Sequence, residues 1–432
     1  MIELDTIVAP ATPPGRSALA IVRIDGPRSN AILTSLSQSS LPAVRTATLT
    51  GLKDIDECIV VRYEAPHSFT GNDLVELTLH GNPLLVERVI EACVALGARM
   101  AEPGEFTERA VLNGKLDLVQ AESIADLINA RTTLQAKLSL SNLEGMLSRK
   151  AAAIRQTLLE VISRLEAALD FSEEGYEFIT RDEVRSRLLA AVRDLAAVAD
   201  TYQRGRATRA GLSAVILGRP NAGKSTLLNR LVGSDRAIVT PIPGTTRDIV
   251  RETIEIGGLP VTLSDTAGLR ETADVVEDIG VQRAREAART ADIVLYLVDG
   301  VTGVTAEDEA ELAALENVQV VYTKADLAGR SGLSISAVSD QGIAELLSRL
   351  DELVRERYAA PEGALVNERQ RLAVAECEEA LQAALAAVDG GLDEQMIVVD
   401  LYRAANALGV LTGAVTREDV LTEIFGKFCI GK

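Results

Sequence analysis

The chain has 432 residues, and at about 150 residues per domain this length predicts about three domains. Its 44 Lys and Arg residues against 63 Asp and Glu residues give a net charge of −19, and the 47% of hydrophobic residues are typical of a globular protein. This composition argues against a disordered chain and a basic wrapper of nucleic acid. No apolar run reaches the about 18 residues of a membrane span, and the acidic start lacks a signal peptide, so we expect a cytoplasmic protein without a membrane partner.

Residues 1–116 predict a mixed α/β domain. Short apolar runs at 17–24 and 57–63, each bounded by turn residues, predict strands, and the alternating segment 73–79 predicts a half-buried strand. Arg23 and Glu76 interrupt these strand patterns. They indicate either a polar pocket or a solvent-facing surface, and the sequence leaves both interpretations open.

Two helical regions flank a second α/β region. Residues 117–208 and 358–432 are rich in Ala, Leu, Glu and Arg, with apolar residues every three to four positions, which predicts helices. Residues 209–357 alternate strand and helix patterns, as is typical of a parallel sheet. This order predicts one discontinuous helical domain that carries the second α/β domain as an insertion, with two separate helical domains as the alternative.

The segment GRPNAGKS at 218–225 fits the phosphate-binding pattern GxxxxGK[ST] between a predicted strand and a predicted helix. Its glycines let successive backbone N–H groups point at phosphate oxygens, and the helix N-terminus adds partial positive charge. We expect Lys224 to reach the β- and γ-phosphates and the Ser225 hydroxyl to bind Mg²⁺. The neighbouring residues predicted to bind the nucleotide are Asn221, Ala222, Gly223 and Thr226.

Two later segments predict further phosphate and metal contacts. Thr246, in the segment GTTRD, offers a second hydroxyl to Mg²⁺. Asp265 begins the segment DTAG at a position where a carboxylate supports the metal, and Gly268 offers an N–H group to the γ-phosphate. The predicted nucleotide-binding residues here are Thr240, Pro241, Ile242, Pro243, Gly244, Thr245, Thr246, Asp265, Thr266, Ala267 and Gly268.

Leu269 occupies the position at which many small GTPases carry the Gln that orients the attacking water. Hydrolysis therefore needs a different group. The nearby polar candidates are Arg270, Glu271 and Glu277. The alternative interpretation of each is an exposed charged residue of a loop.

The segment TKAD at 323–326 predicts the base. The Asp326 carboxylate accepts hydrogen bonds from the N1–H and exocyclic amine of guanine, and adenine lacks these adjacent donors, so the ligand is predicted to be GTP. Such motifs usually begin with Asn, and Thr323 here loses one amide contact. Lys324 belongs to the same motif, and the segment at Ser336 and Ala337 is expected to donate a backbone N–H to guanine O6.

The chain ends in FCIGK. Cys429 is the fourth residue from the end, but Gly431 and Lys432 do not fit a prenylation signal. Cys429 is either part of a frayed tail or a reactive, ligand-contacting thiol with Lys432 as its nearest cation.

Motifs along the whole chain are those of one family. They include DTIVA at 5–9, ATPPGR at 11–16, SFTG at 68–71, PGEF at 103–106, KLDL at 115–118, QAE at 120–122, DLI at 126–128, the segments GRPNAGKS, GTTRD and DTAGLR, and the terminal CIGK. Through these motifs the chain resembles the bacterial MnmE (TrmE) tRNA-modification GTPases from end to end. The N-terminal turns and the tail together separate this family from other GTPases.

The resemblance implies an N-terminal folate-binding and dimerisation domain at 1–116, a helical domain in two parts at 117–208 and 358–432, and an inserted Ras-like P-loop GTPase domain at 209–357. It implies a homodimer that works with an FAD-dependent partner, MnmG (GidA), in a heterotetramer or larger complex. Together they attach a carboxymethylaminomethyl-type group to C5 of the wobble uridine of certain tRNAs. The implied one-carbon source is 5-formyl- or 5,10-methylene-tetrahydrofolate.

The resemblance also implies roles for individual residues. The implied K⁺ ligands are Asn221 and the carbonyls of Thr240, Ile242 and Thr245, the implied Mg²⁺ ligands are Ser225 and Thr246, and the implied folate contacts are Arg23, Glu76, Lys115 and Lys432. The implied catalytic residues are Lys224, Glu277, which orients water in place of the missing Gln, and Cys429, the family's essential tail cysteine. K⁺ and GTP are expected to draw two GTPase domains together, so that no external activating protein is needed.

Two other function classes fit part of the sequence. A ribosome-assembly or translation-type GTPase switch shares the GTPase motifs but usually carries a basic RNA-binding appendage, and this chain has a net charge of −19. A small-molecule folate enzyme with a regulatory GTPase would be active without tRNA. Because phosphate contacts dominate RNA affinity, the acidic chain also predicts that the partner supplies much of the tRNA-binding surface.

Overall fold

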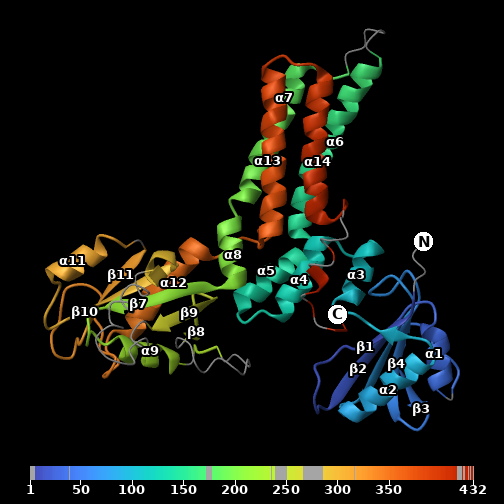
Figure 1. Cartoon of the computed structure of the whole chain (residues 1–432), viewed down its shortest axis with the longest axis horizontal. Helices are drawn as coiled ribbons and strands as arrows, with labels where there is room; N and C mark the ends of the chain where they lie inside the picture. The colour runs from blue at the N-terminus through green and yellow to red at the C-terminus, as the bar shows by residue number, and fades with distance from the viewer. Residues whose placement is uncertain are drawn as a thin grey trace. The chain divides into compact units, whose positions relative to one another are not determined.

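The computed structural model describes residues 5–37, 39–171, 178–234, 236–238, 251–265, 286–315, 317–415, 421, 424–426, 428 and 430–431, with the backbone alone for Arg251 and Asp265. The chain divides into two compact units. The first comprises Met1–Ala125, Ala151–Arg185 and Glu379–Lys432, and the second comprises Asp126–Lys150 and Ser186–Glu378. Each contains one of the two sheets found in the described part of the chain (Figure 1).

The sheet of the first unit has the order β3-β4-β5-β2-β1-β6. Its strands are β1 (Ile7–Pro10), β2 (Leu19–Asp25), β3 (Thr48–Leu52), β4 (Asp56–Tyr63), β5 (Leu74–His80) and β6 (Arg99–Met100). All neighbours pair antiparallel except β1 and β6. The strands predicted at 17–24, 57–63 and 73–79 correspond to β2, β4 and β5.

Alternation along the strands decides which side chains face the core of this sheet. Ala20, Val22 and Ile24 of β2 are buried, and successive strand residues point to opposite faces. The helices α1 (Ser29–Leu36) and α2 (Pro83–Ala95) pack against the buried face. Arg23, between Val22 and Ile24, therefore lies on the face opposite to these helices.

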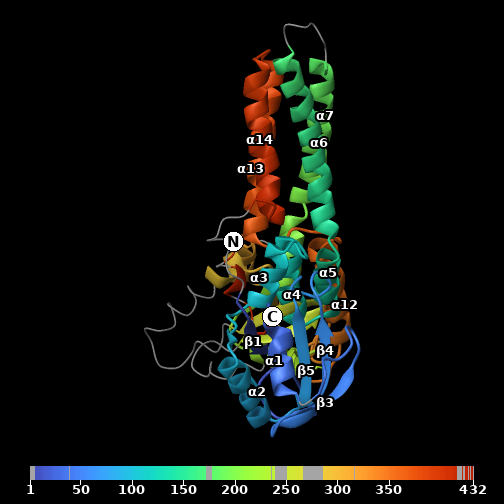
Figure 2. The same cartoon turned by 90° about the vertical axis from the view of Figure 1, so that its right-hand side faces the viewer.

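Further helices complete the first unit. They are α3 (Glu105–Leu112), α4 (Leu118–Ile128), whose last residues belong to the second unit, α6 (Met146–Asp170), whose first residues up to Lys150 belong to the second unit, and α14 (Glu394–Thr412). The helices α6 and α14 lie side by side (Figure 2), where the Tyr402 hydroxyl donates to Glu166 at 2.8 Å and Arg155 Nε donates to the Ala405 carbonyl at 3.1 Å. These two hydrogen bonds link α6 to the middle of α14.

The sheet of the second unit has the order β11-β10-β7-β9-β8. Its strands are β7 (Leu212–Gly218), β8 (Arg251–Ile256), β9 (Leu259–Asp265), β10 (Ile293–Asp299) and β11 (Val318–Thr323), all parallel to their neighbours except β8. The first six residues of β10 are all buried, as is typical of a parallel strand covered on both faces. The carboxyl ends of β7, β10 and β11 consequently meet at one edge, where a ligand site is expected.

Helices surround this second sheet. The helices α9 (Lys224–Val232) and α12 (Ile343–Tyr358) pack into one core with Ile216 and Leu295, while Val215 and Tyr296 face a second apolar cluster. The remaining helices are α5 (Thr133–Leu143), α8 (Tyr202–Ala210) and α11 (Ala306–Leu312), together with α7 (Arg181–Ala199) and α13 (Glu368–Asp389), which belong in part to each unit. None of the helices in the described residues is long and apolar enough to cross a membrane.

Candidate functional site

The loop between β7 and α9 has the backbone shape that a phosphate site needs. Gly218, Asn221 and Gly223 have φ values of +135°, +62° and +91°, in the left-handed region that favours Gly and tolerates Asn. A Cβ atom at Gly218 would lie 2.3 Å from the Leu297 carbonyl oxygen, so the approach of β10 also requires glycine there. The sequence of the loop therefore determines its fold locally.

Lys224, the first residue of α9, folds back over this loop. Its Nζ atom donates to the carbonyls of Gly218 at 2.7 Å and Arg219 at 2.8 Å. The ammonium group lies beside the loop and at the N-terminus of the helix, two features that favour an anion. The next residue, Ser225, presents a hydroxyl at the same helix end.

A cavity of about 420 Å³ joins this loop to two later segments of the chain. It is lined by Pro220, Asn221, Gly223, Lys224, Ser225, Thr226, Leu227, Thr323, Lys324, Asp326, Ile335, Ser336, Ala337 and Val338. The predicted phosphate loop and the predicted base-binding segments thus share one cavity, although about 100 residues separate them.

Hydrogen bonds to the end of β10 hold the end of β11 in place. The buried Thr323 donates its hydroxyl to the Val298 carbonyl at 3.3 Å, and its own carbonyl accepts from the Gly300 N–H at 2.9 Å. Lys324, with a φ of +58°, donates through Nζ to Asp299 Oδ2 at 2.6 Å. This hydrogen bond lowers the pKa of Asp299.

The Lys324–Asp299 pair was not predicted from the sequence. Asp299 and Thr323 are register partners at the ends of parallel strands. The pair could have been predicted from the sequence, because Asp299 ends one predicted strand and Lys324 directly follows the neighbouring one.

The Ser336 segment also lines the cavity. The Ser336 N–H donates to the Gln341 carbonyl at 2.8 Å, and the Ser336 hydroxyl accepts from the Ser339 N–H at 3.3 Å. The Ser336 amide is thereby engaged in this turn, and the donation from the Ser336 and Ala337 segment to guanine O6 stays a prediction.

Other predicted site residues lie outside the described residues, and their roles stay predictions. They are Thr240, Pro241, Ile242, Pro243, Gly244, Thr245, Thr246, Thr266, Ala267, Gly268, Leu269, Arg270, Glu271, Glu277, Cys429 and Lys432, together with the side chain of Asp265. The three cysteines that the structure describes, Cys58, Cys93 and Cys377, are buried thiols, and burial raises the pKa of each to about 12.

Arg23 and Glu76 form an ion pair on the face of the first sheet opposite α1 and α2. They are register partners on β2 and β5, and Arg23 Nε donates to Glu76 Oε1 at 2.8 Å. Both side chains are half-buried, at 19% and 23% exposure. The Arg23 guanidinium lies over the Phe69 ring, 5.6 Å from its centre, and burial together with the Glu76 charge raises the pKa of the neighbouring Tyr63.

Lys115 and the chain end approach this region from other elements. Lys115 Nζ donates to the Pro66 carbonyl at 3.0 Å, so it contacts the segment that also carries Phe69. Ile430 pairs with Pro103, and a Cβ atom at Gly431 would lie 1.9 Å from the Pro10 carbonyl oxygen. Gly431, two residues after Cys429, thus lies close to the end of β1, and Ile430 lies beside Pro103.

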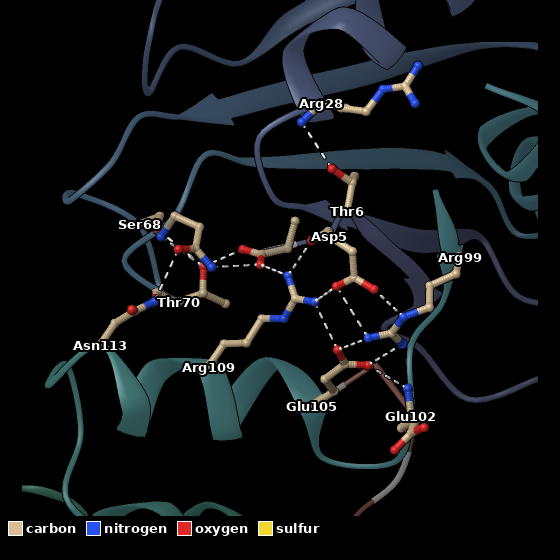
Figure 3. A network of polar contacts seen from close by, with 12 residues as sticks. Asp5, Thr6, Arg28, Ser68, Thr70, Arg99, Glu102, Glu105, Arg109 and Asn113 are labelled. Atoms are coloured by element: carbon tan, nitrogen blue, oxygen red, sulfur yellow. Dashed lines mark hydrogen bonds and ion pairs between the residues drawn. The ribbon is translucent and has the colours of Figure 1, made fainter. Parts of the chain in front are cut away.

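A buried polar network beside this region was missed by the sequence reasoning. Figure 3 shows Arg109 of α3 between Asp5 and Glu105, to which its Nη2 atom donates at 2.7 and 2.9 Å. Its Nη1 atom donates to the fully buried Asp25 at 3.0 Å. Asp25 also accepts from Thr70, so the network connects α3, the end of β2 and the loop before β5.

Opposing effects act on the carboxyl groups of this network. Burial raises the pKa of Asp25, and the bonds from Thr70 and Arg109 only reduce that rise. At Glu105, burial acts in the same upward direction, but the hydrogen bonds from Arg99 and Arg109 outweigh it and the pKa is lowered. The buried Arg109 guanidinium therefore donates to carboxylates whose pKa values are shifted in opposite directions.

Comparisons with known proteins cover nearly the whole chain. The family described as GTP-binding protein TrmE N-terminus matches residues 6–115, and the family described as MnmE helical domain matches residues 118–429. The tRNA modification GTPase MnmE of Koribacter versatilis is 42% identical over 99% of both chains, and that of Moorella thermoacetica is 40% identical over 99% of both. A crystal structure of Aquifex aeolicus Era bound to GDP and AlF4⁻ is 26% identical over 40% of this chain and 67% of that chain, with a TM-score of 0.27.

Proposed function

The chain belongs to the MnmE family of tRNA modification GTPases, and we propose that it hydrolyses GTP in the course of modifying tRNA. With an FAD-binding partner, MnmG, it attaches a carboxymethylaminomethyl-type group to C5 of the wobble uridine of certain tRNAs. The observation that carries the GTPase part of the proposal is the cavity that holds both the phosphate loop and Asp326. The tRNA part rests on family membership.

In this proposal the cavity binds GTP along its length. The Asp326 carboxylate accepts from the guanine N1–H and amine, and the Ala337 amide donates to O6. The loop amides and Lys224 bind the β- and γ-phosphates. The Ser225 hydroxyl, at the helix end that lines the cavity, suits Mg²⁺, with Thr246 as its predicted second hydroxyl. Mg²⁺ neutralises phosphate charge when it is bound.

Asn221 is suited to hold K⁺ beside the phosphates. Its φ of +62° places it at the turn of the loop, and it lines the cavity. An amide oxygen is a ligand that hard cations accept, with the carbonyls of Thr240, Ile242 and Thr245 as the other proposed ligands. K⁺ supplies there the positive charge that an arginine finger supplies in other GTPases. Glu277 is proposed to orient the attacking water, since Leu269 cannot.

The Arg23–Glu76 pair is proposed to bind tetrahydrofolate. A pterin edge has adjacent N–H donors, which suit the two oxygens of Glu76, and the folate glutamate tail suits the cations of Lys115 and Lys432. A 5-formyl- or 5,10-methylene-tetrahydrofolate supplies the one-carbon unit when it is bound. Cys429 belongs to the same proposed site, because Ile430 and Gly431 contact Pro103 and Pro10.

The proposed assembly is a cytoplasmic homodimer joined through residues 1–116, in a heterotetramer or larger complex with MnmG. Since the chain carries a net charge of −19, MnmG is proposed to supply much of the tRNA-binding surface. Tight, salt-sensitive tRNA binding by this protein alone would contradict that division of labour.

The test of the GTPase proposal is GTP turnover in KCl and in NaCl at equal ionic strength. We expect K⁺ to raise the rate at least about tenfold, and we expect Asn221→Ala to abolish this stimulation. Asn229→Ala, an exposed change on α9 outside the cavity, is the matched control and keeps it. Equal rates in both salts would reduce Asn221 to a turn residue and favour a translation-type GTPase switch.

A further inference from the structure

Arg45 is an exposed cation of the first unit that the proposed function does not use. It precedes β3 and has a φ of +57°, in a region that residues other than Gly rarely adopt. Its backbone N–H donates to the Arg62 carbonyl at 2.9 Å, and its Nη2 atom donates to the His67 carbonyl at 3.0 Å. The Arg45 guanidinium is therefore held at the loop that follows β4.

Lys115 contacts the same loop from the turn after α3. Its Nζ atom donates to the Pro66 carbonyl at 3.0 Å, and a Cβ atom at Gly71 would lie 3.3 Å from its Cγ atom, so its stem lies against the loop. The carbonyls that accept from Lys115 and Arg45 belong to consecutive exposed residues, Pro66 and His67. The ammonium and guanidinium groups consequently lie along one exposed turn.

The partners of these two cations are neutral. Each donates to a backbone carbonyl, and neither forms an ion pair with a carboxylate in the part of the chain that the structure describes. The nearby Arg62, by contrast, is paired with Glu64 at 3.0 Å. Two positive charges on one exposed turn of a protein with a net charge of −19 favour the approach of an anionic ligand there.

The Arg45 charge also acts on the group beside the Arg23–Glu76 pair. The Tyr63 hydroxyl donates to Glu76 Oε2 at 3.5 Å, and burial together with the Glu76 charge raises the pKa of Tyr63. The positive charges of Arg23 and Arg45 both act on this pKa in the opposite direction. Arg45 thus lies within electrostatic range of the proposed pterin contact.

This region offers more cations than the shortest folate needs. A tetrahydrofolate with a single glutamate carries two carboxylates in its tail, and the proposed function matches them to Lys115 and Lys432. Arg45 is a further cation on the turn that Lys115 contacts. Each additional glutamate, joined through the γ-carboxyl group, adds a carboxylate to the tail, and a guanidinium suits a carboxylate because it donates two parallel hydrogen bonds.

We propose that Arg45 binds a carboxylate of a poly-γ-glutamyl tail, so that the protein prefers polyglutamylated tetrahydrofolates to the monoglutamate. The inference rests on the proposed folate site and names the class of folate that this site takes. Arg45 is a specificity-determining residue in this account and not a catalytic one, because the one-carbon unit is carried at the pterin end of the molecule.

The experiment is isothermal titration calorimetry of 5-formyltetrahydrofolate, as the monoglutamate and as the triglutamate, with the full chain. For the wild type we expect the triglutamate to bind about twofold to fivefold more tightly, the worth of one exposed ion pair. Arg45→Gln, which keeps a donor for the His67 carbonyl, should bind both forms equally and leave monoglutamate affinity nearly unchanged. Arg88→Gln, at an exposed arginine on α2, is the matched control and should keep the preference.

Ionic strength provides a second measurement of the same contact. Because the Debye length falls to about 3 Å at 1 M salt, we expect the preference for the triglutamate to disappear at 1 M KCl. A preference that persists at this ionic strength would come from neutral contacts of the tail and would contradict the role of Arg45.

The remaining outcomes separate this inference from the proposed folate site. Wild-type affinities for the two forms that agree within about twofold would overturn the inference, and this result needs no variant to fold. A preference that Arg45→Gln keeps and Lys115→Gln removes would assign the added carboxylate to Lys115 and also overturn it. A wild-type chain that binds neither form would instead contradict the proposed folate site.

Discussion

The nucleotide cavity and the Arg23–Glu76 pair both place a cation next to oxygen atoms. The two sites differ in whether those oxygens belong to carbonyl groups or to a carboxylate. Lys224 donates to two neutral backbone carbonyls of the phosphate loop, which orient the ammonium group. Arg23 donates to a carboxylate 2.8 Å away, so the two charges largely offset each other. The first arrangement suits a polyphosphate with several negative charges, and the second suits a nearly neutral ring that is read by hydrogen bonds.

The largest expected effect breaks the first arrangement. Lys224→Ala removes the cation at the phosphate loop, so we expect GTP turnover to fall about hundredfold to thousandfold, as when one preorganised donor is lost from a charged transition state. Phosphate release under saturating GTP measures it. Lys137→Ala changes an exposed lysine paired with Glu362 in the same unit and should leave the rate unchanged. A Lys224→Ala rate within about threefold of the wild type would remove Lys224 from the mechanism.

The two regions also differ in how far the sequence predicts them. The phosphate loop is contiguous, and its glycines and lysine act on the backbone of the same eight residues. Its fold and its place between β7 and α9 could therefore be predicted residue by residue. Thr323 and Asp326 could be predicted as well, because strand ends in a parallel sheet meet at one edge.

The N-terminal region depends on contacts that local patterns do not encode. Alternation predicts β2 and β5, but β3 and β4 lie between them in sequence, so the register that pairs Arg23 with Glu76 is set by the whole sheet. The sequence consequently left a pocket and a solvent face equally open there. The contact of Arg109 with Asp25 joins residues 84 positions apart, so local sequence patterns could not predict it either.

The second prediction tests whether the polar network of the first unit is structural. Arg109 is 7% exposed, and removing one partner of a buried ion pair leaves its carboxylates uncompensated. We expect Arg109→Met to lower the free energy of unfolding by about 3 kcal/mol. Urea unfolding followed by far-UV circular dichroism measures this change. Arg193→Met, at a 77% exposed arginine, should cost almost nothing, and GTP turnover of the folded Arg109→Met protein should be unchanged.

Acid offers a second measurement of the same network. The pKa of Glu105 is lowered in the folded chain, so its contribution to stability is present above pH 4.5, its ordinary value, and is lost as the pH falls through the lower folded value. The raised pKa of Asp25 acts in the opposite direction. If Arg109 holds Glu105 in its charged form, Arg109→Met flattens the loss of stability below pH 4.5. An acid profile unchanged by the substitution would contradict this account.

The smallest expected effect concerns the second arrangement, and it separates a binding site from a structural ion pair. Glu76→Gln keeps the shape of the side chain and a possible bond to Arg23, but it replaces two charged acceptors by one neutral acceptor and a donor. If a pterin edge binds there, affinity for 5-formyltetrahydrofolate should fall about tenfold, because charge-assisted hydrogen bonds are roughly twice as strong as neutral ones. Isothermal titration calorimetry measures this affinity. In cells that carry only the Glu76→Gln variant, hydrolysed tRNA should contain less of the modified uridine.

The control must distinguish loss of the ligand contact from loss of the ion pair. Glu57→Gln changes an exposed carboxylate on the neighbouring β4 and should leave folate affinity unchanged. Arg23→Gln breaks the same ion pair while it keeps the Glu76 carboxylate. If Glu76 reads the pterin directly, Glu76→Gln must weaken folate binding more than Arg23→Gln does. Equal losses would mean that the ion pair only shapes the sheet face, and no loss in either variant would place the folate site elsewhere in the chain.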